Sequence, residues 1–200
     1  VYAESLDSIA DSALKLEITL KLGSLCAERL DQAEQAIIWL KRALELDSRN
    51  LEIMESLAGL QTKTGKWPEL AETLERMIEL STENEQKVIL LDRLAHVFND
   101  QMYENEKALR CYKQLLILDP NHPTGLRAVE QIYEELDDFD SLSDNLRRQA
   151  EIFEDELIDE VRAAGTYREI LRLRPGHLPA VTALERILRK RHDFFQRHQP

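Results

Sequence analysis

One helical pattern occurs three times in this sequence, and it restricts the chain to a narrow range of folds. Within Glu104–Pro120, one stripe of an α-helix is formed by Ala108, Tyr112, Leu115 and Leu116. Asp119 and Pro120 end this helix, because the residue before a proline is kept out of the helical region. The same pattern recurs in Asp31–Ser48 and Val161–Pro175. Three copies in register predict a chain built from repeated helices.

The spacing of the copies indicates what the repeating unit is. A shift of 72 residues aligns Ala36 with Ala108 and Asp47 with Asp119. Half of that shift carries a weaker likeness, in which Leu70 lies between Ala36 and Ala108. The unit is therefore a helix pair, with alternate first helices lengthened.

The first helix of each pair has a pattern of its own, an apolar residue followed by a small one and, three positions later, by another marker residue. The copies are Leu22-Gly23 with Cys26, Leu57-Ala58 with Gln61, and Leu94-Ala95 with Phe98. Together with the second-helix stripe and the Asp-Pro turn, this pattern resembles the tetratricopeptide repeat (TPR) family. The tryptophan that the family has at the start of the first helix is absent, since Thr19, Met54 and Leu91 hold that position.

The resemblance covers essentially the whole chain and implies an all-α fold. We expect a right-handed superhelical solenoid of antiparallel, TPR-like helix pairs, about ten helices in all, forming a single domain over residues 1–200. The expected parts are a partial helix at 1–11, repeats at 12–48, 49–82, 83–120, 121–156 and 157–191, and a cut end or tail at 192–200. Both ends fall inside a repeat, so we expect a fragment of a longer array, in a style that resembles bacterial arrays.

A phase irregularity near residues 139–160 interrupts the pattern. The second-helix signature at Ala163 comes 17 residues earlier than the regular spacing predicts. The segment Phe139–Glu156 begins like a second helix but ends like a first helix, at Ala150 and Phe153. We therefore expect either a local change of curvature or a continuous bent helix near Glu154–Asp159. A domain swap through this hinge is an alternative that the sequence leaves open.

Composition excludes several classes of partner and location. The net charge of −12 argues against nucleic acid, because phosphate contacts need clustered Lys and Arg. No run approaches the roughly 18 apolar residues of a membrane span, so we expect no membrane insertion. The first ten residues lack the pattern of a signal peptide. We expect Cys26 and Cys111 to be free buried thiols, which fits a cytoplasmic location.

No residue pattern indicates a catalytic, metal or cofactor site. The five histidines are scattered, and no Cys or His pair has metal-ligand spacing. His122 and His177 lie in turns between repeats, where we expect them to cap helices. Four aspartates resemble a calcium loop but lack its central glycine and final glutamate, so capping is expected there too: Asp137, Asp138, Asp140 and Asp144. Trp67 and Phe139 open equivalent helices and are expected to pack in the core. We predict a protein that is not an enzyme.

The TPR resemblance implies a concave groove lined by the first helices. Carried over residue by residue, the family's groove positions are Glu17, Ser24, Glu52, Glu55, Thr62, Asp92, His96, Asn99, Arg127, Gln131 and Glu134. The family's clamp for chaperone tails needs Lys and Asn at several of these places, so that ligand is not expected. The mostly acidic set would suit a partner peptide that bears Lys or Arg.

Three functions are compatible with these observations. The preferred one is a non-enzymatic protein–protein interaction scaffold that binds a peptide or helix of a partner in its concave groove. The first alternative is a structural spacer or oligomerisation segment of a longer repeat protein, with self-association through exposed ends or a swap near residues 154–159. The second alternative is a regulatory domain of a larger enzyme.

Overall fold

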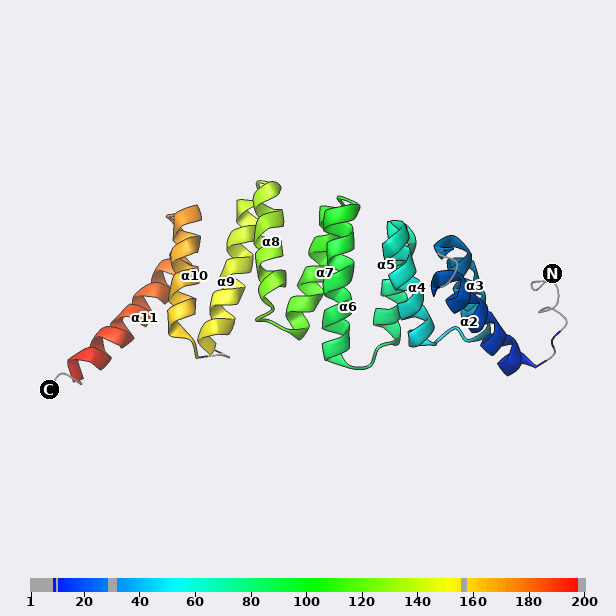
Figure 1. Cartoon of the computed structure of the whole chain (residues 1–200). Coiled ribbons are helices and arrows are strands. Elements are labelled where there is room, and N and C mark those ends of the chain that lie inside the picture. Colours follow the sequence, from blue (N-terminus) through cyan, green and yellow to red (C-terminus); the bar gives the residue numbers. More distant parts are fainter. Residues whose placement is uncertain (1–8, 10, 29–31, 156–157, 198–200) are drawn as a thin grey trace. The chain divides into compact units, whose positions relative to one another are not determined.

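The described part of the chain consists of helices and their connections (Figure 1). The structure, a computed structural model, describes the backbone of residues 9, 11–28, 32–155 and 158–197, and side chains as far as residue 192. It contains two compact units, Val1–Leu118 (unit 1) and Asp119–Pro200 (unit 2). The prediction of an all-α fold built from repeated helices is confirmed for these residues. The partial helix predicted at residues 1–11 lies almost entirely outside them.

Unit 1 contains helices α2 to α7. Their bounds are Ser12–Glu28 (α2), Ala33–Leu46 (α3), Leu51–Thr64 (α4), Trp67–Leu80 (α5), Asn84–His96 (α6), the π-helical segment Val97–Gln101 (η1) and Asn105–Leu118 (α7). Unit 2 contains Pro123–Glu135 (α8), Phe139–Asp155 (α9), Glu160–Leu173 (α10) and Leu178–Arg197 (α11). The last helix therefore continues beyond residue 191, where the sequence predicted a tail. No helix among the residues covered by the structure is both long and apolar enough to cross a bilayer.

The second-helix stripe forms the core of each helix pair, as predicted. Its small residues and aromatic residues are at most 2% exposed: Ala36, Ala108, Tyr112, Ala163 and Tyr167. The small residues of the first helices, Ala58 and Ala95, are fully buried. In unit 1, Ile37, Leu40 and Ala43 of α3 pack with α4 in one apolar cluster. Burying this surface stabilises each pair by about 25 cal/mol per Å².

Hydrogen bonds at the helix ends distinguish the two kinds of helix. The long first helices end with a backbone N–H that bonds the carbonyl six residues earlier, as Gln32 to Cys26 (2.9 Å) and Glu104 to Phe98 (2.8 Å). These two bonds are related by the 72-residue shift. Second helices end with an ordinary helical bond followed by a turn, as at Asp47, whose carbonyl accepts from the Asn50 N–H.

By this criterion α9 changes its role along its length. It follows α8 as a second helix follows a first, yet it ends like a first helix, with the Asp159 N–H bonding the Phe153 carbonyl at 2.7 Å. The helix after it, α10, ends like a second helix at Arg174, whose carbonyl accepts from the His177 N–H. In agreement, α9 packs more extensively on α10 than on α8. The change of phase predicted from the 17 missing residues is therefore present.

Two details of the sequence interpretation are wrong. The continuous bent helix at Glu154–Asp159 does not form, because α9 ends at Asp155 and Ile158 has a φ of +52°, in the left-handed region. Residues 156 and 157 lie outside the described residues. Phe139, predicted to pack in the core, is 44% exposed. It stands in the first turn of α9, directly after a connection that leaves Leu136 exposed as well.

Candidate functional site

The predicted groove residues are divided between the two units. In unit 1, the positions are Glu52 and Glu55 on α4, Asp92 and His96 on α6, and Asn99 on η1. In unit 2, Arg127, Gln131 and Glu134 all lie on α8. Except for Asp92 and Asn99, which are half-buried, all of these residues are exposed. They therefore remain candidate contact residues, one set in each unit.

Glu55 of α4 already has a partner in the neighbouring first helix. Both of its carboxylate oxygens accept hydrogen bonds from Nη1 of Arg93 on α6, each at 2.9 Å. Arg93 was not among the residues predicted from the sequence, since its position gives no motif. The pair neutralises part of the acidic surface, so this face of unit 1 is less negative than the sequence indicates. A ligand there meets a bridged pair rather than a free carboxylate.

His96 is held by the buried tyrosine of the next helix. Its Nδ1 lies 2.6 Å from Oη of Tyr112, and the two rings meet edge to face at 65°. Burial, reinforced by the Asp92 and Asp100 carboxylates, raises the pKa of Tyr112. The phenol therefore stays neutral, and the tautomer of His96 decides which of the two groups donates the hydrogen bond. Asp92 Oδ1 is buried beside them without a hydrogen-bond partner. The contact between His96 and Tyr112 joins the exposed side of α6 to the core.

The remaining predicted residues of unit 1, Glu52 and Asn99, make local contacts. Glu52 stands in the first turn of α4, where its N–H bonds the N-cap side chain of Asn50 at 3.1 Å. A negative side chain there also complements the helix dipole. Asn99 donates from its amide to Asp100 at 2.8 Å. Neither contact involves another first helix.

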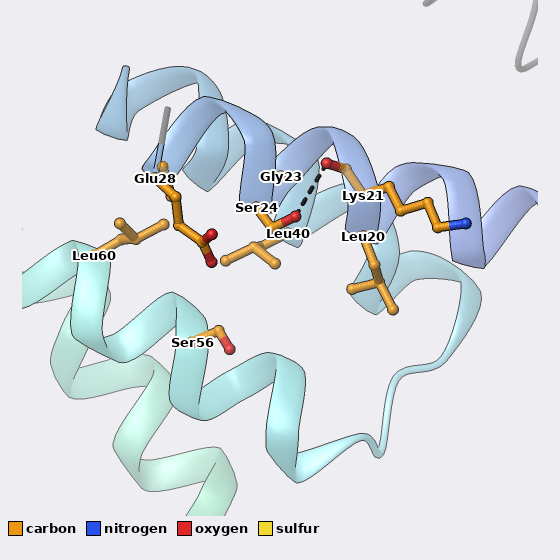
Figure 2. A pocket seen from close by; sticks show the side chains of 9 residues that line it. Leu20, Lys21, Gly23, Ser24, Glu28, Leu40, Ser56 and Leu60 are labelled. Carbon is orange, nitrogen blue, oxygen red and sulfur yellow. Dashed lines mark hydrogen bonds between the residues drawn. The ribbon is translucent and has the colours of Figure 1, made fainter. Parts of the chain in front are cut away.

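A pocket of about 440 Å³ lies between the first helices α2 and α4 of unit 1 (Figure 2). Leu20 of α2, Leu40 of α3 and Leu60 of α4 point into it. Its polar lining residues are Lys21, Ser24, Glu28 and Ser56. Ser24 is held by a hydrogen bond from its hydroxyl to the Lys21 carbonyl, at 3.1 Å. This volume falls within the roughly 300–1,000 Å³ of typical ligand sites.

Gly23 of α2 lies directly against α3 beneath this pocket. A Cβ atom at Gly23 would lie 3.5 Å from Leu40, already in van der Waals contact. Of the pocket residues, only Ser24 was predicted to lie in the groove, and Gly23 was noted as a first-helix marker. The signal that could have indicated the rest of the pocket is a pair of apolar residues, Leu20 and Leu60, on the predicted groove face of the first helices. Both are half-buried in the structure.

A second, smaller cavity of about 270 Å³ lies in unit 2, between α8, α9 and α10. Its lining is acidic at one side, with Glu130 and Glu134 of α8 and Glu169 of α10. Glu134 was predicted as a groove residue. The other two predicted residues of α8, Arg127 and Gln131, do not line this cavity; Gln131 instead donates to Glu135 at 2.8 Å.

The two turn histidines cap helices, as predicted, whereas of the four aspartates with the same prediction Asp138 caps α9 and Asp140 instead pairs with Arg174 at 2.9 Å. His122 and His177 each accept a backbone N–H bond on Nδ1 at 3.2 Å, and Asp138 accepts from the Ser141 N–H at 3.0 Å. Cys26 and Cys111 are free and buried, and burial raises the pKa of the Cys111 thiol to about 11. In the described stretches no group of three or more His, Cys, Asp or Glu side chains is arranged to hold a metal ion.

Comparison with known proteins agrees with this geometry. Residues 53–88 match the family model described as tetratricopeptide repeat. No curated protein matches the sequence. A crystal structure of MamA protein is 17% identical, with 92% of this chain and 96% of that chain covered and a TM-score of 0.50.

Two further solved structures have a similar fold. A tetratricopeptide repeat protein from Parabacteroides merdae is 17% identical, with 92% of this chain and 80% of that chain covered and a TM-score of 0.50. A structure of Naa15/Naa10 bound to HypK-THB gives 19% identity, coverage of 88% of this chain and 30% of that chain, and a TM-score of 0.54. At these identities the likeness establishes the fold alone.

Proposed function

Because the chain belongs to the tetratricopeptide repeat family, whose members are in general non-enzymatic interaction modules, we propose that it is a protein–protein interaction scaffold. The proposed site is the groove of unit 1, where α2 and α4 flank the leucine-lined pocket. Its ligand is an extended or helical segment of a partner protein. The residues that line this pocket indicate which chemical properties the partner segment has.

The observation that carries the proposal is the apolar centre of a polar pocket. Leu20 and Leu60 are only half-buried, so an apolar side chain of a partner would remove more of their surface from water. Ser24, Ser56 and Glu28 lie around them with exposed polar groups that can fix the direction of a peptide backbone. An apolar centre with a polar rim is the usual anatomy of a protein-binding site.

The charged face beside the pocket supports a partner with basic residues. Glu52, Asp92 and Glu28 lie on first helices of this unit, and only Glu55 is neutralised by Arg93. Two free and buried cysteines also support the cytoplasmic location that we propose. The complex of Naa15/Naa10 with HypK-THB indicates that a chain with this fold occurs in a protein assembly; the partner of the present chain remains part of the proposal.

The test fills the pocket without disturbing the core. Ser56 is exposed on α4 and lines the pocket, so Ser56→Trp would occupy the space meant for the partner. We expect affinity capture from lysate to lose at least about 90% of a partner bound by the wild-type chain, a tenfold effect. Gln114→Trp, on the exposed surface of α7, is the control of equal bulk.

Equal capture by both variants and the wild type would refute a site in this pocket. A second variant tests the charged face: Glu55→Arg combined with Arg93→Glu keeps the bridge between α4 and α6 but exchanges its charges. We expect weaker capture by this double variant with an unchanged melting temperature. A partner indifferent to both changes binds elsewhere on the chain.

A further inference from the structure

The cavity of unit 2 combines three carboxylates with an apolar wall. Glu130, Glu134 and Glu169 line it from two helices, and the wall consists of Leu142, Leu146 and Leu173. Its volume of about 270 Å³ is below the usual range of sites for drug-sized ligands, which begins near 300 Å³. The space therefore fits one side chain with its backbone rather than a whole small molecule.

The carboxylates of the cavity repel one another and are only partly compensated. Burial raises the pKa of Glu130, and Glu134 and Glu169 raise it further, while Gln149 and Arg127 lower it. Glu169 is paired at 2.5 Å with Arg172 in the next turn of its own helix. Glu134 has no ion-pair partner within the part of the chain that the structure describes. Because this negative charge is only partly compensated, the cavity favours the binding of a cationic group.

A second observation comes from the buried amide of α9. Gln149 is 8% exposed, lines the cavity, and its Nε2 makes no hydrogen bond of normal geometry. The amide lies near enough to Glu130 for a hydrogen-bonding interaction that lowers the pKa of that carboxyl, but an amide NH2 group has two N–H donors, so this contact leaves at least one of them without a partner. A buried donor without a partner is unfavourable, so a ligand with a carbonyl group would stabilise this site by accepting a hydrogen bond.

We propose that this cavity binds one basic residue, arginine or lysine, of an extended peptide. The cationic group lies between Glu130 and Glu134, the aliphatic stem lies on the leucine wall, and the backbone carbonyl accepts from Gln149 Nε2. Long basic side chains bury their stems in this way while the charge meets carboxylates. This inference rests on the proposed role as a peptide-binding scaffold and assigns ligand chemistry to a second site.

A metal ion is a less suitable occupant of the same cavity. A hard cation such as Ca²⁺ needs six to eight oxygen ligands that converge within about 2.6 Å of one point. The three glutamates do not form such a group, since no metal-competent cluster of acidic side chains occurs in the described residues. The aliphatic wall would also leave a metal ion without ligands on one side.

The test uses the full chain and a pair of labelled peptides. One peptide carries a single arginine among alanines, and its partner replaces the arginine with neutral citrulline, which has nearly the same shape. We expect the arginine peptide to bind at least about tenfold more tightly in fluorescence anisotropy, because a charge-assisted pair is lost with citrulline. Equal binding of the two peptides would overturn the proposal.

Two variants of the chain test whether the arginine peptide binds in this cavity. Glu134→Gln is expected to weaken the arginine peptide about tenfold, whereas Asp144→Asn, an equal change of charge on the exposed surface of α9, should change binding less than about twofold. Equal losses in both variants would mean attraction to the overall charge and would contradict the site. Binding of Ca²⁺ alone that blocks the peptide would also contradict it, in favour of a metal site.

Folding and function are separated by two further measurements. Glu130→Gln should weaken the peptide while raising the melting temperature, so a loss of binding cannot be attributed to unfolding. If capture of a partner is lost in Ser56→Trp but unchanged in Glu134→Gln, this inference is refuted and the proposed function stands. If the arginine peptide binds but no partner is lost in Ser56→Trp, the proposed function is refuted and the inferred peptide site in the cavity stands.

Discussion

The leucine-lined pocket of unit 1 and the acidic cavity of unit 2 differ because the repeat is regular around the first and shortened around the second. In unit 1, the pocket lies between two first helices, α2 and α4, and leucines converge at its centre. In unit 2, the cavity lies between a first helix, α8, and α10, which carries the second-helix stripe. Glu169 of α10 occupies the place that Gln114 has in α7, where the side chain is exposed.

The difference shows how a deletion changes the chemistry of a repeat protein. Because α9 serves as second helix to α8 and as first helix to α10, it brings an outer face of α10 to a cavity. Glu169 there is polar, as expected for a position equivalent to the exposed Gln114 of α7, whereas Thr166 is equivalent to the buried Cys111. The acidic cavity thus follows from the changed phase rather than from substitution of a groove residue.

The largest effect in this comparison is expected at the floor of the apolar pocket. Leu40 is 6% exposed and belongs to the core cluster, so Leu40→Ala leaves a cavity and should lower the free energy of unfolding by about 2–5 kcal/mol. Ile38 lies two residues before Leu40, on the exposed side of α3, so Ile38→Ala should cost less than about 0.5 kcal/mol. Urea denaturation followed by circular dichroism measures both. Similar losses would show that Leu40 is not part of a packed floor.

A smaller effect is expected at the shortened connection of unit 2. Ile158 has a φ of +52° and a 79% exposed side chain, a conformation that costs a β-branched residue about 1–2 kcal/mol. Ile158→Asn should therefore raise the free energy of unfolding by up to about 1 kcal/mol, since asparagine tolerates this region. Val161→Asn, at an exposed helical position of α10, should give no such gain. A loss of stability in Ile158→Asn would contradict the conclusion that the backbone of Ile158 is strained.

The two units should respond equally to the removal of a helical glycine. Gly59 in α4 and Gly165 in α10 each have open space where a Cβ would stand, and both have helical backbones. Replacing either with alanine should stabilise the chain by roughly 0.5–1 kcal/mol, because alanine loses less conformational freedom. Thermal melts of the two variants test this. A gain in one unit only would indicate that the helices are not equally formed.

The smallest effect is expected from the acidic cavity, and it depends on pH. Because the pKa of Glu130 is raised in the folded chain, the stability linked to this group is fully present below its unfolded pKa. It is lost as pH rises through the folded pKa. Glu130→Gln should therefore gain stability over the wild type at neutral pH, and the gain should vanish in acid. The effect is small since the carboxyl keeps some contact with solvent.

Denaturation curves at neutral pH and at a pH below the usual glutamate range measure this difference. Asp144→Asn serves as the control, because it removes an exposed carboxylate of the same unit. A gain for Glu130→Gln that persists in acid would mean that the carboxyl is not the cause. Equal gains in both variants would point to the overall negative charge of the chain.

Much of the candidate site depended on features that a pattern of residue types does not carry. Glu55 was predicted to line an acidic groove, but nothing in the sequence indicated Arg93, whose bond to it joins residues 38 positions apart. His96 was predicted as a contact residue, although Tyr112 of another helix holds its ring. Glu134 was predicted without Glu169, which lines the same cavity from another helix. Each of these is a contact between different helices.

What the sequence determined by itself is the repeating helix pair and the place where it is shortened. A stripe at helical spacing buries the same face wherever it occurs, so Ala36, Ala108 and Ala163 are all fully buried. The 17-residue deficit before Ala163 likewise required a helix that changes its role. Only the tertiary structure decided which polar groups are compensated and where space remains between helices. Those properties depend on how side chains of separate helices meet, and no periodicity along the chain records that.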